Sequence, residues 1–495
     1  MVFNSYSFIL IFLPLITVLY YQIRHLHRPV MTKAFLLAAS LFFYGYHHLS
    51  ALTVLIVSIA VNYAVSLALR RLDMQSSAVI KKAVLILGIV MNLSLLFYCK
   101  YLGFFGDMVG SLLHRDITLS SLLLPLGISY YTFSQIAYLV DCYRDPATVC
   151  GFLNYALFVS FFPKITVGPI ALSTEMVPMF DDAAESETDY GKIAGGLMAF
   201  SFGLAKKMML ADTLGQYVDF GYANVTILGS LDALLVMTAY TLQIYFDFSG
   251  CCDMARGICL MLGMDLPQNF DSPYRSLSIN EFWKRWHITL TRFFRKYVYF
   301  PLGGNRKGKI RTYFNQMLIF LLSGLWHGAS LSFLLWGAIH GIGIIVSKLL
   351  APVSVKCPKP IRLLLTFTFV NFAWVYFRAP DITIANIMFM RLFTGGISRI
   401  NPINADFIVA AMPAEFDFIQ WLVVKYTTLN YYHTGSVIIL IPIIFSLYAA
   451  LFMKNTDERI EGSVLSGRLA LVTAALLFLG IISLPTLSVF IYENF

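Results

Sequence analysis

The 495-residue chain is 58% hydrophobic and 13% charged, against about 45–50% and about 25% in ordinary soluble domains. This composition excludes a soluble globular protein. The net charge of +9 predicts no nucleic-acid partner, because basic residues in so apolar a chain usually lie at the cytoplasmic edges of membrane segments.

Long apolar runs recur from Phe8 to Ile491. Because a bilayer span needs about 20 apolar residues, they predict roughly ten to twelve transmembrane helices. We expect one membrane domain over residues 1–495. The first run, residues 7–21, has no basic residue before it, and Arg24, Arg28 and Lys33 follow it. This pattern is typical of a retained anchor whose N-terminus lies outside the cell.

Positive charge is concentrated in four short loops, which we place inside the cell. Two apolar runs, Ala34–Tyr46 and Ala51–Leu69, separate the first two loops and keep both on one side. The last run, Leu469–Ile491, leaves an internal loop and brings the C-terminus outside. The loop residues are Arg24, Arg28 and Lys33; Arg70, Arg71, Lys81 and Lys82; Lys348, Lys356, Lys359 and Arg362; and Lys454, Arg459 and Arg468.

Between about residues 100 and 280 the number of membrane crossings cannot be counted in this way. Stretches rich in Gly, Pro and Tyr, such as Leu124–Tyr131, predict broken or re-entrant helices, which membranes tolerate only where protein or a water-filled cavity covers the backbone. Two carboxylates, Asp247 and Asp253, fall within an apolar run. Their simplest interpretation is that each holds an Arg or a Tyr hydroxyl across a helix interface.

A basic segment follows, with nine Lys and Arg residues and no acidic residue from Lys284 to Arg311. At about 100° per residue, five of the cations share one helical face and aromatic residues the other, which predicts one basic amphipathic helix. Such a helix binds anionic lipid headgroups, or it lines a pocket for a phosphate-bearing donor beside the turn Gly303–Arg306. Both interpretations stay open. The five cations are Lys284, Arg285, Arg292, Arg295 and Lys296.

Two histidines stand out at predicted membrane depth. His287 lies at the edge of the aromatic face, and His327 lies in the expected apolar helix Ser323–Ser330. A buried histidine is usually a core residue, but ionisable groups inside membranes are costly and usually serve function. The small residues beside His327 would let another helix or a thin substrate approach it. We expect His340 to be structural. Neither functional histidine has metal-ligand spacing with the aspartates or with the seven scattered cysteines, so we predict no metal.

Several motifs between residues 161 and 345 resemble those of the membrane-bound O-acyltransferase family, in particular its bacterial alginate O-acetylase branch. Two departures are Cys251–Cys252, where the family pattern has Tyr-Ser, and Val167, where it has Ala. Neither touches the histidines. The matching stretches are Thr241–Gly250, Leu266–Arg275, Glu281–Leu290, Tyr299–Arg306 and Gly324–Ser330, with weaker matches at Phe161–Ile170 and Gly203–Asp212.

The resemblance implies an all-α polytopic membrane protein whose helices surround a central tunnel. His287 and His327 are the histidines it carries over, with His327 as the catalytic one. A histidine of near-neutral pKa suits removal of a hydroxyl proton as an acyl group moves from a thioester. The resemblance further implies that acetyl-CoA is a substrate, not a permanently bound cofactor. If the basic segment lines a donor pocket, the phosphates of acetyl-CoA meet the five cations.

The expected reaction is O-acetylation of an extracytoplasmic polysaccharide by a protein of the bacterial cytoplasmic membrane. The polymer is left open: alginate, peptidoglycan, cellulose or another. The expected partners are membrane lipid and an extracytoplasmic SGNH-type acetyltransferase or another polysaccharide-modifying protein. Two alternatives remain at this point, a membrane transporter and a non-catalytic subunit of a polysaccharide export complex.

The C-terminal stretch Phe490–Phe495 carries aromatic residues in the spacing Phe-x-Tyr-x-x-Phe. Aromatic residues at a membrane exit commonly anchor a helix. The spacing also resembles the acyl-accepting tail of a small membrane peptide that works with the related teichoic-acid D-alanylation acyltransferase. This resemblance gives the hypothesis that residues 490–495 are an acceptor tail and that Tyr492 carries the acyl group transiently.

Overall fold

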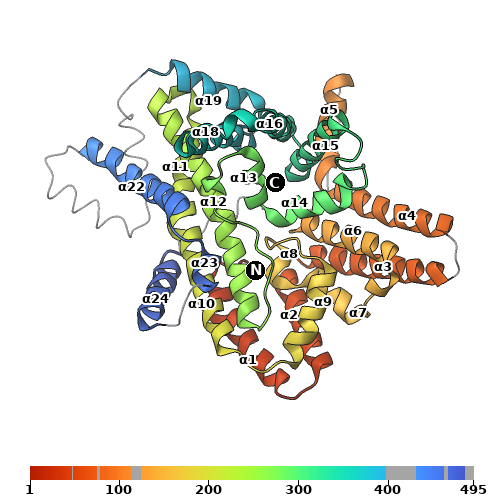
Figure 1. The fold of residues 1–495 in the computed structure, drawn as a ribbon. Helices are drawn as coiled ribbons and strands as arrows, with labels where there is room; N and C mark the ends of the chain where they lie inside the picture. Colours follow the sequence, from red (N-terminus) through yellow and green to blue (C-terminus); the bar gives the residue numbers. More distant parts are fainter. Residues whose placement is uncertain (47, 75–77, 114–123, 397–430, 462–465, 485–495) are drawn as a thin grey trace. The chain divides into compact units, whose positions relative to one another are not determined.

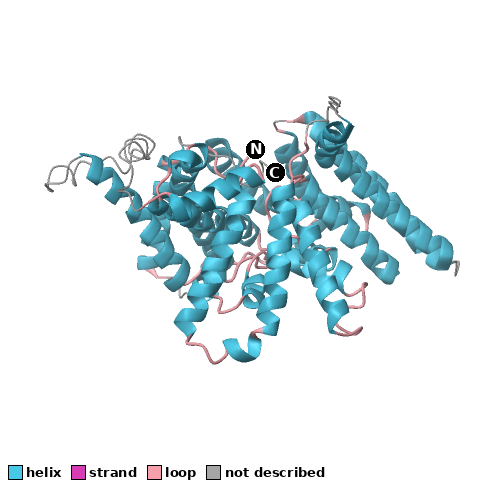
Figure 2. Cartoon of the chain, turned by 90° about the horizontal axis from the view of Figure 1, so that it is seen from above, coloured by secondary structure: helices cyan, strands magenta, loops and turns pink. Residues whose placement is uncertain are grey.

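The structure is a computed structural model, and it describes all residues except 47, 75–77, 114–123, 397–430, 462–465 and 485–495. All regular secondary structure in this described part is helical, without a strand (Figure 2). The predicted class, an all-α polytopic membrane protein, is confirmed.

Six helical stretches are long and apolar enough to cross a membrane, judged by length and composition. Shorter apolar helices of 10–17 residues add four more segments. The predicted runs at 34–46 and 51–69 fall largely within α2 (Pro29–Gly45) and α3 (Leu49–Met74). The six stretches are Ser7–Arg24, Leu49–Asp73, Ala78–Gly110, Tyr190–Ala223, Leu331–Leu349 and Lys359–Arg378, and the shorter helices are Pro29–Gly45, Ile382–Thr394, Leu440–Phe452 and Gly467–Ile482.

Contacts divide the chain into two compact units. Unit 1 comprises Met1–Phe200, Met254–Gln268 and Arg292–Phe300. Unit 2 comprises Ser201–Asp253, Asn269–Thr291 and Pro301–Phe495. A single membrane domain, the expectation from composition, stays a prediction.

Unit 1 contains most of the N-terminal helices. Its elements are η1 (Ser7–Phe12), α1 (Leu13–Arg24), α2, α3, α4 (Ala78–Leu96), η2 (Phe97–Tyr101), α5 (Leu102–Leu113), α6 (Ile128–Arg144), η3 (Pro146–Thr148), α7 (Phe152–Ser160), α8 (Phe162–Ile165), α9 (Ser173–Glu185), the larger part of α10 (Tyr190–Ala205) and η7 (Arg295–Tyr299).

Buried polar side chains join three helices of this unit, α3, α4 and α6, which lie side by side (Figure 1). Asn62 on α3 and Asn92 on α4 exchange side-chain hydrogen bonds of 3.3 and 2.6 Å. Ser58 on α3 donates to Gln135 on α6 at 2.8 Å. Because lipid supplies no hydrophobic force between membrane helices, such bonds and close packing hold them together.

Unit 2 contains both candidate histidines. Its elements are η4 (Lys206–Ala211), α11 (Asp212–Ala223), η5 (Val225–Ile227), most of α12 (Ser230–Met261), η6 (Pro273–Arg275), α13 (Ile279–Arg285), the start of α14 (Ile288–Phe294), α15 (Lys309–His327), α16 (Leu331–Leu349), α17 (Ala351–Ser354), α18 (Lys359–Arg378), α19 (Ile382–Thr394), α22 (Tyr431–Phe452), α23 (Thr456–Glu461) and α24 (Gly467–Ile482).

Helices α15 and α16 pack closely within unit 2, and α16 packs in turn on α18. The close approach depends on glycine. A Cβ atom on Gly324 would lie 2.3 Å from the carbonyl oxygen of Phe333, and one on Gly337 would lie 2.3 Å from that of Phe320. The expectation that small residues beside His327 admit another helix is therefore confirmed.

Candidate active site

The basic segment is not one helix, so that prediction is wrong. Helix α13 ends at Arg285, α14 begins at Ile288, and His287 between them has φ of +43°. The chain at residues 269–271 bonds to backbone groups on both sides of the break: Ile288 N–H donates to the Asn269 carbonyl at 3.0 Å, and Asp271 N–H donates to the Arg285 carbonyl at 3.0 Å. These bonds stabilise an interruption that no Gly or Pro marks in the segment.

His287 is held at this break. Its exposed fraction is 1%. Nδ1 lies 3.1 Å from the side-chain oxygen of Asn269, and Phe248 on α12 meets the ring edge-on at 4.8 Å between centroids. Nε2 has no hydrogen-bond partner among the described residues. His287 lies outside the candidate spans, and burial lowers its pKa to about 3, so the imidazole is neutral at physiological pH.

His327 is the last residue of α15 and is 3% exposed. Three aromatic rings surround it: Trp326 at 4.8 Å, Trp336 at 5.2 Å and Phe377 at 5.0 Å between centroids. The helix does not continue to Ser330 as expected, because the Ser330 hydroxyl accepts from the Phe333 N–H and caps the start of α16. A capping residue has non-helical backbone, so the chain turns directly after His327.

Trp326 connects the two histidines. Its ring lies 4.8 Å from His327 and 5.9 Å from His287, between centroids, with interplanar angles of 77° and 66°. The structure thus brings together two histidines that are 40 positions apart in the chain and surrounds them with aromatic side chains. A desolvated cluster of this kind suits proton transfer away from bulk water.

His340 on α16 has the surroundings of a structural residue. The Trp283 indole N–H donates to its Nδ1 at 3.2 Å, and its ring packs against Trp336 at 5.0 Å between centroids. This bond satisfies a buried indole donor, as buried tryptophans usually require.

The five predicted donor-binding cations differ in their surroundings. Lys284 and Arg285 lie on α13, Arg292 on α14, and Arg295 and Lys296 on η7, so the five do not share one arc of a single helix. Lys284 and Arg285 belong to unit 2, and the other three to unit 1. Three are paired with carboxylates: Arg285 with Asp271 and Glu281 at 3.0 and 3.1 Å, Arg292 with Glu175 at 2.5 Å, and Lys296 with Asp141 at 2.9 Å. Lys284 and Arg295 are exposed and occur in none of the ion pairs found between described residues.

The two aspartates of α12, Asp247 and Asp253, hold lysines, where an Arg or a Tyr hydroxyl was expected. Lys207 lies 2.7 Å from Asp247 and 2.8 Å from Asp212, and all three side chains are at most 5% exposed. Asp253 lies 2.6 Å from Lys206. Buried charges are tolerated where opposite charges compensate them, so both aspartates join α12 to η4.

No group of three or more His, Cys, Asp or Glu that could hold a metal ion occurs in the described ranges. Tyr492 and the predicted acceptor tail 490–495 lie outside the described residues.

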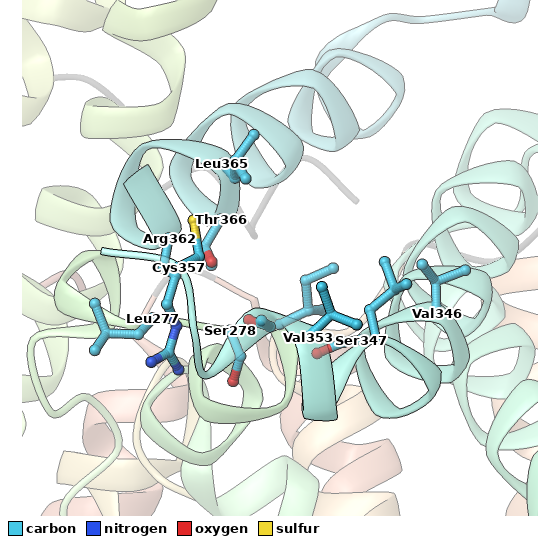
Figure 3. Close-up of a pocket in the computed structure, with 12 residues that line it drawn as sticks. Leu277, Ser278, Val346, Ser347, Val353, Cys357, Arg362, Leu365 and Thr366 are labelled. Carbon is cyan, nitrogen blue, oxygen red and sulfur yellow. The ribbon is translucent and has the colours of Figure 1, made fainter. Parts of the chain in front are cut away.

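A cavity of about 320 Å³ lies within unit 2, where α13 begins, α16 ends and α18 begins (Figure 3). Most of its lining is apolar. Ser278 and Thr366 are among its polar residues, and Arg362 is the one charged side chain in the lining. Neither histidine lines it, so it is separate from the aromatic cluster.

Sequence reasoning did not find Asn269 or Trp326. Asn269 lies in the motif Leu266–Arg275, but its contact with His287 depends on a break that the local sequence does not reveal. Trp326 precedes His327, and its aromatic character alone indicated only core packing. The one signal in the sequence that could have indicated these two residues is their position within the family motifs, Leu266–Arg275 and Gly324–Ser330.

The fold and site define a multi-pass, all-helical membrane protein with a buried pair of histidines. A sequence model of the membrane-bound O-acyltransferase family matches residues 114–389, more than half of the chain and both histidines. The chain belongs to this family, and it is an acyltransferase.

Curated relatives agree with this assignment. The chain is 40% identical to the peptidoglycan O-acetyltransferase of Helicobacter pylori over 412 residues, which cover 77% of this chain and 78% of the relative. It is 36% identical to the probable alginate O-acetylase AlgI of Pseudomonas aeruginosa, covering 82% and 77%. A teichoic acid D-alanyltransferase of Bacillus subtilis is 29% identical, covering 44% and 57%.

Proposed function

We propose that this protein transfers an acetyl group from cytosolic acetyl-CoA to hydroxyl groups of an extracytoplasmic cell-envelope polysaccharide. The similarity to a peptidoglycan O-acetyltransferase, 40% identity across 77% of the chain, carries the proposal. Relatives named for alginate O-acetylation support the same class of acceptor. Peptidoglycan, alginate and cellulose are therefore the first polymers to test.

In the proposed reaction His327 is the general base. It takes the hydroxyl proton as the oxygen bonds to the thioester carbonyl carbon, the carbon–sulfur bond breaks, and the proton passes to the departing CoA thiolate. The aromatic rings around His327 exclude water that would compete as an acceptor. His287 supplies the second titratable group of the cluster.

Donor binding is proposed to involve the cations of the basic segment, Lys284, Arg285, Arg292, Arg295 and Lys296. Charge-assisted hydrogen bonds to phosphate are among the strong ones in proteins. Lys284 in unit 2 and Arg295 in unit 1 are each exposed. Each is better suited to a phosphate than the other three cations, which already bind carboxylates.

The chain is proposed to lie in the bacterial cytoplasmic membrane with both termini outside. The distribution of Lys and Arg in its short loops supports this orientation. The acetyl group would reach the polymer through an extracytoplasmic SGNH-type acetyltransferase or another polysaccharide-modifying partner, either directly or by way of Tyr492.

The proposal is tested with the full chain in cells that lack its own gene. The measured quantity is the acetate that mild alkali releases from purified envelope polysaccharide. We expect His327→Ala to lower it by about 10²–10⁴-fold, the usual contribution of a general base.

The exposed His25 provides the control variant His25→Ala, which should acetylate normally. Membrane content of each variant, measured by immunoblot, separates lost chemistry from lost protein. Normal polymer acetylation by His327→Ala at normal membrane content would contradict the role of His327. Absence of acetate in the polymers of cells with the wild-type chain would contradict the proposed reaction.

A further inference from the structure

Asn269 lies in the loop after α12, and its side chain contacts His287. Its exposed fraction is 3%. Three groups lie within hydrogen-bond distance of its side-chain oxygen. The Thr289 N–H and the Thr289 hydroxyl donate to it at 3.2 and 2.9 Å, and His287 Nδ1 lies 3.1 Å away. The side-chain nitrogen of Asn269 lies 3.5 Å from Cys252 Sγ.

The backbone fixes the orientation of this amide. An Asn side chain can usually be turned over without a visible difference, and only its hydrogen-bond partners decide which end is oxygen. Here the Thr289 N–H is a backbone donor that cannot become an acceptor. The Asn269 atom facing it must therefore be Oδ1, because Nδ2 would place two donors against each other.

That orientation in turn decides the tautomer of His287. An amide oxygen only accepts hydrogen bonds, so Nδ1 of His287, 3.1 Å away, must carry a proton. The ring is neutral at physiological pH because burial lowers its pKa. In a neutral imidazole with a proton on Nδ1, Nε2 has a lone pair and no proton. This nitrogen is buried and has no hydrogen-bond partner among the described residues.

We infer that Asn269 is a positioning residue, which holds His287 as the Nδ1–H tautomer so that Nε2 acts as a proton acceptor during acyl transfer. The inference rests on the proposed function and deepens it. Of the two roles open to a neutral histidine, donating to the developing oxyanion or accepting a proton, Asn269 selects the second. The proton that Nε2 accepts is the one that His327 removes from the acceptor hydroxyl. The imidazolium so formed keeps its Nδ1–H bonded to Asn269, and the proton leaves by Nε2 for the departing CoA thiolate.

The first test reads the tautomer directly. The full chain is labelled with ¹⁵N-histidine, reconstituted in phosphatidylethanolamine–phosphatidylglycerol vesicles and studied by solid-state NMR, in which protonated and unprotonated ring nitrogens differ widely in shift. The spectrum of His287→Gln identifies the signals of His287. We expect one Nδ1–H species in the wild-type protein. A proton on Nε2 of the neutral ring would overturn the inference.

Variants at Asn269 extend this test. Asn269→Leu removes the acceptor, and we expect a second tautomer to appear and acetylation to fall at least about tenfold, as when a triad histidine loses its orienting partner. Asn269→Asp keeps an acceptor for all three donors. Its negative charge raises the pKa of His287, so acetylation should persist but decline at a higher pH on the acid side than in the wild type.

Cys252→Ala is the matched control, because it changes the contact at the other end of the Asn269 amide and leaves the His287 contact in place. It should retain the Nδ1–H tautomer and the wild-type pH profile. If Asn269→Leu fails to fold, the wild-type spectrum still tests the tautomer of His287, and the pH profile of Asn269→Asp still tests the positioning role of Asn269.

The pH profile of acetylation separates a positioning role of Asn269 from a purely structural one, because a purely structural role would not shift it. An unshifted profile in Asn269→Asp, measured at normal membrane content, would overturn the positioning role. Absence of acetyl transfer by the wild-type chain would instead contradict the proposed function, and the NMR arm would still report the tautomer.

Discussion

At the scale of single residues, Lys207 gives a direct test of how buried charges are stabilised in this protein. Its ammonium lies between Asp212 and Asp247 at 2.8 and 2.7 Å, with 2% of the side chain exposed. We expect Lys207→Met to lower the free energy of unfolding by about 3–5 kcal/mol, because it leaves two buried carboxylates without this cation. Thermal unfolding in detergent measures the loss.

The exposed Lys192 serves as the control for this substitution. Lys192→Met should change stability by no more than about 0.5 kcal/mol, as surface substitutions usually do. Adding Asp247→Asn to Lys207→Met should recover part of the loss, since it removes one of the two buried negative charges. A Lys207→Met protein as stable as the wild type would mean that the three charges do not stabilise the fold.

Residue types singled out the candidate histidines, but not the contacts that these histidines make. His287 and His327 were candidates because ionisable residues at predicted membrane depth are expensive. The role of Asn269 was not recognisable, because asparagine is common in loops and only the fold brings its side-chain oxygen to 3.1 Å from His287 Nδ1. The local sequence pattern does not reveal contacts between residues that are far apart in the chain.

At the scale of elements, apolar run length predicted helices well. Ala51–Leu69 lies within α3, Leu49–Met74, because a long apolar run in lipid can satisfy its backbone only as a helix. The break between α13 and α14 could not be predicted in this way. The backbone groups at the break bond to residues 269–271, which lie outside the segment. The helical periodicity of the sequence therefore continues across residues 286 and 287, although the helix itself is interrupted there.

The division of the basic segment gives a prediction about its cations. Charge reversal of the two exposed cations, Lys284→Glu with Arg295→Glu, should raise the acetyl-CoA concentration needed for half-maximal rate by roughly 30-fold, if each of the two lost charge-assisted bonds costs about 1 kcal/mol net. The rate at saturating donor should change less. Radiolabelled acetyl transfer in inside-out membrane vesicles measures both quantities.

Two exposed cations outside the segment, Lys356 and Lys359, make the control pair Lys356→Glu with Lys359→Glu, which should keep the wild-type donor dependence. Reversing Arg292 or Lys296 is a poorer test, because it would repel Glu175 or Asp141 and disturb unit 1 itself. An unchanged donor dependence in the Lys284→Glu, Arg295→Glu variant would favour the alternative role, binding of anionic lipid headgroups.

At the scale of the whole molecule, both histidines and the aromatic cluster belong to unit 2, which is assembled from three separate stretches of chain. Composition predicted the membrane class because 58% hydrophobic residues can be buried only in lipid. It does not determine how many compact units the helices form, since the same apolar helices can pack in many ways. The expected ring of helices around a tunnel stays a prediction.

Transfer across the membrane is the remaining step, and Tyr492 provides its test. The aromatic spacing of Phe490–Phe495 gives two interpretations, an anchor at the membrane exit or an acyl-accepting tail. Tyr492→Phe preserves the ring and removes the one oxygen that can form an ester. If the tail carries the acetyl group, polymer acetylation in cells should fall by at least about 10²-fold, because covalent catalysis needs that nucleophile.

Tyr190→Phe removes the hydroxyl of an exposed tyrosine elsewhere and should leave acetylation unchanged. An anchor depends on the ring, so under that interpretation Tyr492→Phe acetylates normally while Tyr492→Ala lowers membrane content. The two variants together therefore separate chemistry from anchoring. Normal acetylation by Tyr492→Phe would require the acetyl group to pass from acetyl-CoA to the external acceptor without a tyrosyl ester, with the histidine pair acting on that acceptor's own hydroxyl.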